Sequence, residues 1–191
     1  EMSGGVKNVK VSNCKFSGTD VGLRFKSTRG RGGVVENIYI DHIAMNDIAT
    51  EPLLFDLFYG GKSAIEALVD GDNTSTDMPA QPVDETTPQF RNIFVNNVVC
   101  RDARRAMLFN GLPEMNVENV VVQNTTIEAE IGAEINESTN VLLDGVRIIP
   151  RKGPALKINN AKDVTVKNFT YPEGCEPCVV TGSRNRDIEI Q

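Results

Sequence analysis

A four-residue pattern, in which Asn or Asp is followed by an apolar, a variable and a second apolar residue, recurs along the whole chain. It begins at Asn8, Asn37, Asn92, Asn119, Asn140, Asp163 and Asp187. Alternation of this kind predicts short strands with one buried face. Apart from one step of 55 residues, the repeats are 21 to 29 residues apart. That spacing is typical of a solenoid in which each repeat forms one coil.

A second family of strands lies between these repeats. Aligning its members predicts one inward column of Phe25, Phe55, Phe109, Ile135, Ile158 and Val180. It also predicts an outward polar column of Lys26, Asp56, Asn110, Asn136 and Asn159. Each coil therefore carries at least two strands and two bends. We expect an all-β fold, a single-stranded parallel β-helix of about seven coils that forms one domain over residues 1–191.

Asparagine also recurs five residues after the start of the repeat. It is found as Asn13, Asn97, Asn124 and Asn168, with His42 and Gly145 as the exceptions. An amide side chain at a bend can bond local backbone and the same amide one coil above. We therefore expect a buried ladder of asparagines, on which Asn124 and Asn168 are inaccessible. His42, the one histidine, is expected to be structural for the same reason.

Residues 60–89 interrupt the pattern. They contain two adjacent glycines, three prolines and a polar run from Asp70 to Asp77. The run lacks the glycine and terminal glutamate of a calcium-binding EF-hand loop. We predict a long solvated loop inserted between strands.

Composition and charge narrow the range of partners. The net charge of −6 argues against nucleic acid or an anionic membrane surface as the main partner, and no apolar run is long enough to span a bilayer. Cys14 and Cys100 occupy inward positions. Cys175 and Cys178 bracket a proline turn and could pair in an oxidising compartment. No Cys and His set has zinc-ligand spacing, and we expect no cofactor.

Residues 22–33 carry the clearest candidate chemistry. Leu23 and Phe25 alternate with Arg24 and Lys26, and a glycine-rich turn with Arg29 and Arg31 follows. A strand would place both of its cations on one face. Arginine can grip a carboxylate through two hydrogen bonds, and lysine adds a point charge. The segment therefore suits a polyanionic ligand. The alternative is a solvated strand face that ends in a basic turn.

Acids suited to catalysis are not grouped in the sequence. Glycoside chemistry needs two or three carboxylates that converge on one face. Asp20 and Asp56 are the carboxylates that fall near Arg24 and Lys26 by register. We expect them to be structural or to lie at the rim of a ligand site, and we assign no catalytic residue.

Several segments resemble glycoside hydrolase family 28, the polygalacturonases and related pectin hydrolases. The resemblance rests on residues 1–9, on Gly-Leu-Arg-Phe-Lys within residues 18–26, on Gly-Arg-Gly-Gly-Val at 30–34 and on Glu-Asn-Ile at 36–38. Residues 59–62 and 108–115 resemble the bacterial, exo-acting branch. The resemblance implies a right-handed parallel β-helix that hydrolyses α-1,4 galacturonosyl linkages with inversion.

The resemblance also implies roles for single residues. Arg24 and Lys26 match the motif that binds the galacturonate carboxylate, and Tyr59 matches a position at the substrate rim. The partner would be an acidic polysaccharide or oligogalacturonide. The family's Asn-Thr-Asp, Asp-Asp and Gly-His-Gly motifs do not occur in the chain and would lie before residue 1. Family members are secreted or periplasmic, and we expect the same here.

Two main hypotheses follow. In the first, the chain is the C-terminal half of a polygalacturonase-like enzyme, with the N-terminal coils missing, and is inactive alone. In the second, it is a non-catalytic solenoid that binds acidic sugars or is purely structural. A lyase, which would use calcium and a basic catalyst, is a weaker third. We also expect the open N-terminal coil to self-associate or to be covered by a loop.

Overall fold

The computed structural model describes residues 4–59 and 79–191, and they form ten β-strands. The strands are β1 (Val6–Ser17), β2 (Leu23–Lys26), β3 (Val34–Ile48), β4 (Leu53–Asp56), β5 (Gln89–Asn110), β6 (Val117–Asn136), β7 (Ser138–Asn159), β8 (Lys162–Lys167), β9 (Cys178–Thr181) and β10 (Arg186–Ile190). Within these ranges there is no helix that could cross a lipid bilayer. Of the expected loop, residues 60–78 lie outside the described part, and residues 79–88 contain no strand.

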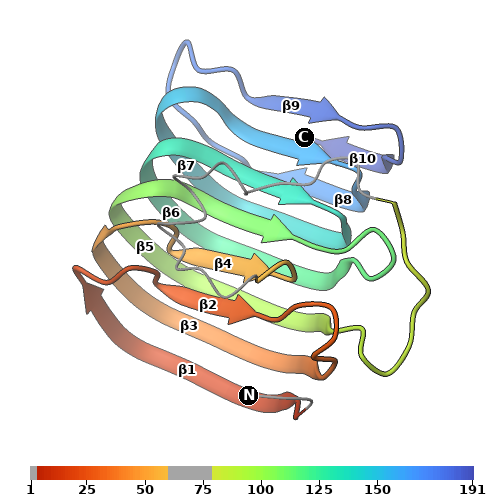
Figure 1. Cartoon of the computed structure of the whole chain (residues 1–191). Helices are drawn as coiled ribbons and strands as arrows, with labels where there is room; N and C mark the ends of the chain where they lie inside the picture. Colours follow the sequence, from red (N-terminus) through yellow and green to blue (C-terminus); the bar gives the residue numbers. More distant parts are fainter. Residues whose placement is uncertain (1–3, 60–78) are drawn as a thin grey trace.

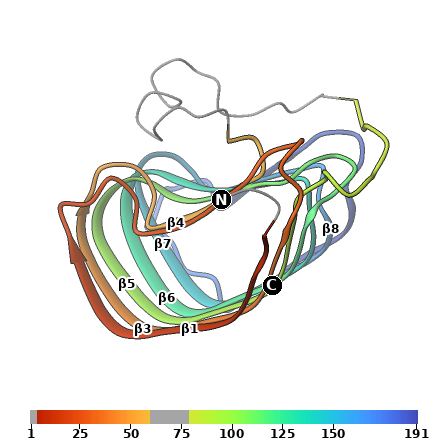
Figure 2. The same cartoon turned by 60° about the horizontal axis from the view of Figure 1, so that its bottom comes forward.

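The named strands pair in parallel and stack into one coiled sheet. One path runs β1-β3-β5-β6-β7-β8-β10, while β2 pairs with β4, β4 with β5, and β9 with β7. The long strands β5, β6 and β7 bend, so that each belongs both to this path and to the second stack formed with β2, β4 and β9. Figure 1 shows the strands stacked from β1 to β10, with the two chain ends at opposite ends of the stack. Seen nearly along the stack, the strands follow one curved outline around a common interior (Figure 2).

The register confirms the predicted column, but Val180 at its end is 47% exposed and does not point into the core as predicted. Successive Cα partners are Phe25, Phe55, Phe109, Ile135, Ile158 and Val180. The rings of Phe25 and Phe55 stack with centroids 4.7 Å apart, and Phe109 meets Phe55 edge-on at 4.6 Å. Phe55 and Phe109 are fully buried. From Phe25 to Ile158, this column belongs to or packs against one continuous apolar core.

The predicted polar column has the expected register, and Lys26 is exposed as expected, but the outward exposure of its asparagines was wrong. Asn110, Asn136 and Asn159 are only 6%, 6% and 4% exposed. The turn that follows each strand folds back over them: Gly111, for example, donates its backbone N–H to the carbonyl of Asn136. Gly182 lies so close to Asn159 that an added Cβ would be 2.5 Å from its Oδ1. The asparagines of this column are therefore covered by turns.

The first residue of every repeat adopts a left-handed backbone conformation. The φ angles lie between 52° and 58° for Asn8, Asn37, Asn92, Asn119, Asn140, Asp163 and Asp187. The second bend is left-handed too, and includes His42 (φ 54°) and Gly145 (φ 65°). Asn, Asp and Gly tolerate this conformation better than other residues. The recurrent Asn and Asp thus mark the places where each coil turns.

A ladder of amide hydrogen bonds joins the first bends. The Nδ2 groups of Asn37, Asn92, Asn119 and Asn140 each donate to the Oδ1 of the preceding rung, at 2.7–3.3 Å. At the second bend, where we expected such a ladder, Asn97, Asn124 and Asn168 each bond the side chain that precedes the bend in the neighbouring coil. Asn124 Nδ2, for example, donates to Asn96 Oδ1 at 2.9 Å. Asn124 and Asn168 are exposed, so the prediction that they are inaccessible was wrong.

Among the strands that the structure describes, none pairs with the outer edge of β1 or of β2, so the stack is open there. Val9, Val11, Leu23 and Phe25 are only partly buried there and line a hollow of about 300 Å³. This surface has the apolar character that the sequence predicts for the first coil. Its self-association stays a prediction.

The bend at Asn119 offers a test of the ladder. Asn119→Gly keeps the left-handed backbone but removes both amide bonds, so we expect a loss of roughly 1 kcal/mol of unfolding free energy. Asn119→Ala removes the same bonds and adds left-handed strain, so we expect about 1 kcal/mol more. Denaturant unfolding of the two variants measures the difference. Equal stabilities would show that the conformation of this bend contributes nothing.

Candidate functional site

The strand β2 presents Arg24 and Lys26 on the face opposite its core side chains. Leu23 and Phe25 pack against the apolar core, as the alternation predicts. By register, Arg24 lies beside Leu54 and Lys26 beside Asp56 of β4. Arg24 is half-buried, and Lys26 is exposed.

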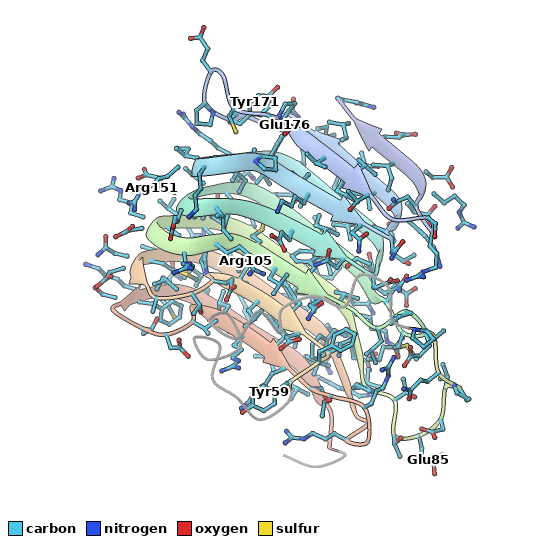
Figure 3. All side chains as sticks on the ribbon, turned by 45° about the horizontal axis from the view of Figure 1, so that its top comes forward. Tyr59, Glu85, Arg105, Arg151, Tyr171 and Glu176 are labelled. Atoms are coloured by element: carbon cyan, nitrogen blue, oxygen red, sulfur yellow. The ribbon has the colours of Figure 1, made fainter. Side chains whose placement is uncertain are left out.

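Tyr59 is held above this strand by backbone bonds. Its N–H donates to the carbonyl of Ser27 at 3.0 Å, and Thr28 forms an antiparallel bridge with Phe58. The N–H of Phe58 also donates to Asp56 Oδ1 at 2.9 Å, which fixes the turn after β4. Figure 3 shows Tyr59 projecting near the β2 end of the stack.

Three cations surround the Tyr59 ring. The Lys26 ammonium lies 4.4 Å from the ring centroid, and the guanidinium carbons of Arg24 and Arg31 lie 5.0 Å and 5.6 Å from it. Each such contact contributes roughly 0.5–2 kcal/mol. Tyr59 therefore stabilises a group of charges that would otherwise repel one another.

Among the described residues, 4–59 and 79–191, the three cations Arg24, Lys26 and Arg31 form no ion pair with a carboxylate. Arg24 Nε is buried and has no hydrogen-bond partner in that part of the chain. A buried donor left unpaired costs about 1–3 kcal/mol, and this atom is itself inaccessible, so an incoming anion would meet the exposed Lys26 side chain first. The arrangement can therefore bind an anion.

Asp56 lies beside this group. Burial raises its pKa, and this outweighs the opposing effects of the Phe58 N–H, the Asn110 amide and the Arg24 charge. The amide of Asn110 donates to Asp56 Oδ1 at 3.0 Å. Asp56 thus supports the turn that carries Tyr59, as expected for a structural carboxylate. Asp20 is exposed, and its backbone carbonyl accepts a bond from the Thr50 hydroxyl.

Arg29, which we included among the substrate-binding residues, is already paired. Its Nε and Nη2 donate to the two carboxylate oxygens of Glu114 at 2.6 Å and 2.8 Å. The Glu114 side chain is only 4% exposed. The pair joins the turn after β2 to the turn between β5 and β6. We therefore assign Arg29 a structural role and leave it out of the anion site.

A second charged group was missed by the sequence analysis. Arg105 is buried, and it lies 3.6 Å from both Glu51 and Glu134; Lys157 lies 3.6 Å from the same Glu134. Burial raises the pKa of Glu51 despite the Arg105 charge. Figure 3 shows Arg105 further along the stack than Tyr59. Glu51 lies in the loop between β3 and β4, where no periodic pattern could have revealed it.

The other candidate residues, the cysteines and His42, have the environments of structural side chains. Cys100 is buried, which raises its pKa to about 12. Cys175 and Cys178 are both free thiols, and burial raises the pKa of Cys178 to about 11. His42 Nδ1 lies 2.7 Å from Asp41 Oδ2. No group of three or more His, Cys, Asp or Glu side chains in the described ranges could hold a metal ion.

The Arg29–Glu114 pair can be tested through pH. Burial opposes ionisation of Glu114, but the bonds and charge of Arg29, with backbone bonds, lower its pKa overall. A lowered carboxyl pKa adds stability above the unfolded value near 4.5, and that stability is lost as the pH falls through the folded value. We expect Glu114→Gln to cost about 3 kcal/mol at pH 7 and progressively less below pH 4.5.

Melting curves at pH 7 and at acidic pH measure this loss. Glu118→Gln, a change of the same chemistry at an exposed position of β6, is the control and should leave the melting temperature unchanged. A Glu114→Gln loss that is the same at both pH values would contradict the assignment of a stabilising ion pair.

The known proteins that resemble this chain match its N-terminal part. Residues 2–71 match the model of glycosyl hydrolases family 28. A polygalacturonase of Ralstonia nicotianae is 44% identical over 63 residues, which cover 31% of this chain and 12% of that protein. An endo-polygalacturonase of Pectobacterium parmentieri is 38% identical over 58 residues, covering 30% and 14%.

A polygalacturonase of Malus domestica is 41% identical over 54 residues, covering 28% of this chain and 12% of that protein. In these three alignments the chain spans only 12% to 14% of the relatives' length. No solved structure is a significant match. The matched segment contains Arg24, Lys26 and Tyr59, and over residues 2–71 it bears out the predicted resemblance to glycosyl hydrolases family 28.

Proposed function

We propose that this chain contributes the uronate-binding part of a pectin-degrading glycoside hydrolase of the polygalacturonase type. The matched family segment and relatives named polygalacturonase support this reaction class. The stacked parallel strands support the fold that goes with it, a right-handed parallel β-helix of about seven coils. The proposed ligand is the galacturonate carboxylate of an acidic polysaccharide or oligosaccharide.

The observation that carries the proposal is the convergence of Arg24 and Lys26 on Tyr59, with Arg24 Nε left without a partner in the described part of the chain. A uronate carboxylate can accept two bonds from a guanidinium and one from an ammonium. The tyrosine ring and the strand hold the two cations in place before the ligand arrives. Such preorganisation reduces the entropy that binding must offset.

These residues bind and orient a uronate, but they do not provide the paired carboxylates that hydrolysis with inversion requires. That reaction needs one acid to protonate the leaving oxygen and another carboxylate to activate water. In our proposal these acids belong to other parts of the intact enzyme. Arg24 and Lys26 would fix the sugar in register with them, so that the bond to be cleaved is held in a reactive geometry.

The test combines binding and turnover by this chain. We expect oligogalacturonide binding that weakens with added salt, and no release of reducing sugar from polygalacturonate above background. Arg24→Ala and Lys26→Ala should each weaken binding about tenfold or more, because each removes a charge-assisted bond. Calorimetry measures the affinity, and a reducing-sugar assay measures turnover.

The control is Arg101→Ala, which removes the same charge from an exposed position of β5. It should change binding less than about twofold, as a surface charge away from the ligand does. Binding that survives both site variants would refute the proposed site. Turnover above background would instead assign chemistry to acids of this chain, Asp20 and Asp56 first.

A further inference from the structure

The loop between β3 and β4 holds the segment that leads into β2. The backbone N–H of Gly22 donates to the Glu51 carbonyl at 3.0 Å. The N–H of Leu23 donates to the Pro52 carbonyl at 2.8 Å. A Cβ on Gly22 would lie 2.5 Å from the Pro52 carbonyl oxygen, so the loop and the segment are in close contact. Arg24 follows Leu23 directly, and its position on β2 therefore depends on this loop.

Arg105 holds the same loop from the side of β5. The N–H groups of Arg104 and Arg105 both donate to the Thr50 carbonyl, at 3.0 Å and 3.1 Å. The buried Arg105 side chain places its Nε 3.6 Å from Glu51 Oε1. Thr50 in turn donates its hydroxyl to the Asp20 carbonyl at 2.8 Å. A continuous set of contacts therefore runs from β5, through the loop, to the segment that leads into β2.

The contact between Arg105 and Glu51 is a poor source of stability. Its 3.6 Å separation is too long for a hydrogen bond, and Arg105 Nε has no such partner within residues 4–59 and 79–191. Burial raises the pKa of Glu51, and the Asp56 and Asp20 charges act in the same direction against Arg105. A raised carboxyl pKa means that stability is lost as the pH rises through that value. A buried acid that opposes folding in this way is typical of functional sites.

We propose that Arg105 is a positioning residue for the uronate site: by facing the ionised Glu51 it fixes the β3–β4 loop and, through that loop, the place of Arg24 on β2. The inference rests on the function proposed above. Arg105 acts from further along the stack than Tyr59 and does not touch the ligand itself (Figure 3). Its Nη1 lies 3.6 Å from Glu134 on β6, so a second carboxylate compensates the same buried charge.

Glu51→Gln is the direct test, because it keeps the shape of the side chain and removes the charge that faces Arg105. We expect digalacturonate binding at pH 7, measured by calorimetry, to weaken about fivefold. The melting temperature should not fall, because a neutral amide costs less to bury and Glu134 still faces the arginine. Glu134→Gln is the matched control. It removes the other carboxylate near Arg105 and should change the affinity less than about twofold.

The pH dependence of binding separates positioning from a merely structural role. The charged groups that face Glu51 are Arg105 on β5, Asp56 on β4 and Asp20 before β2. As the pH falls, Glu51 of the parent chain is protonated and loses its attraction for Arg105. The ratio of the parent affinity to the Glu51→Gln affinity should therefore fall toward one. Titration of the ligand carboxylate cancels in this ratio, since both proteins bind the same ligand.

The outcomes separate this inference from the function on which it rests. Equal affinities of the parent and Glu51→Gln at pH 7, a ratio that does not change with pH, or an equal loss in Glu134→Gln would each overturn the positioning role. If Arg24→Ala still weakens binding in those cases, the uronate site stands. If Arg24→Ala has no effect, the proposed function fails, and the positioning role fails with it.

Discussion

The left-handed bend at the start of each repeat is the constraint on which the rest of the structure depends. Asn or Asp fills it in all seven repeats, with φ between 52° and 58°. A bend at the same place in each coil keeps successive strands in register, so like residues stack on like. The amide ladder from Asn8 to Asn140 then ties the coils together at that bend.

This register also explains how the candidate site arises. In the described part of the chain, β2 pairs with β4 and lies at the open end of its column. Asp56 follows Phe55 on β4 and accepts the Phe58 N–H, which turns the chain back over β2 and brings Tyr59 to the cations. Asp56 is buried in this turn, and its raised pKa reflects the free-energy cost of burying a charged carboxylate. The strand pairing that stacks the coils therefore also positions the charged side chains of the candidate site.

Much of the fold could be predicted because its information is local and periodic. The alternation within repeats and their spacing give the strands, the inward column from Phe25 to Ile158 and the bends. The asparagine ladder was expected at the second bend, but lies at the first. The reason is geometric. Whether a bend asparagine bonds the identical amide of the next coil or the side chain before the bend depends on the direction of its own side chain, which the repeat does not encode.

Contacts between distant segments were harder to foresee. Arg29 and Glu114 are 85 residues apart, and nothing local marks them as partners. The burial of Asn136 and Asn159 depends on turns from neighbouring coils, and alternation alone places both residues outside. Arg24 and Lys26 were found because a strand necessarily puts them on one face. The family resemblance placed Tyr59 only at the substrate rim. Its contact with both cations was not predicted and requires the chain reversal at Phe58.

The central claim is that Arg24 and Lys26, gathered around Tyr59, hold a uronate carboxylate. The most direct measurement is a crystal structure of the chain with digalacturonate bound. Our account predicts one carboxylate within hydrogen-bond distance of both side chains, with the guanidinium of Arg24 and the ammonium of Lys26 as donors. A sugar bound elsewhere, with this group of cations unchanged and unoccupied, would contradict it.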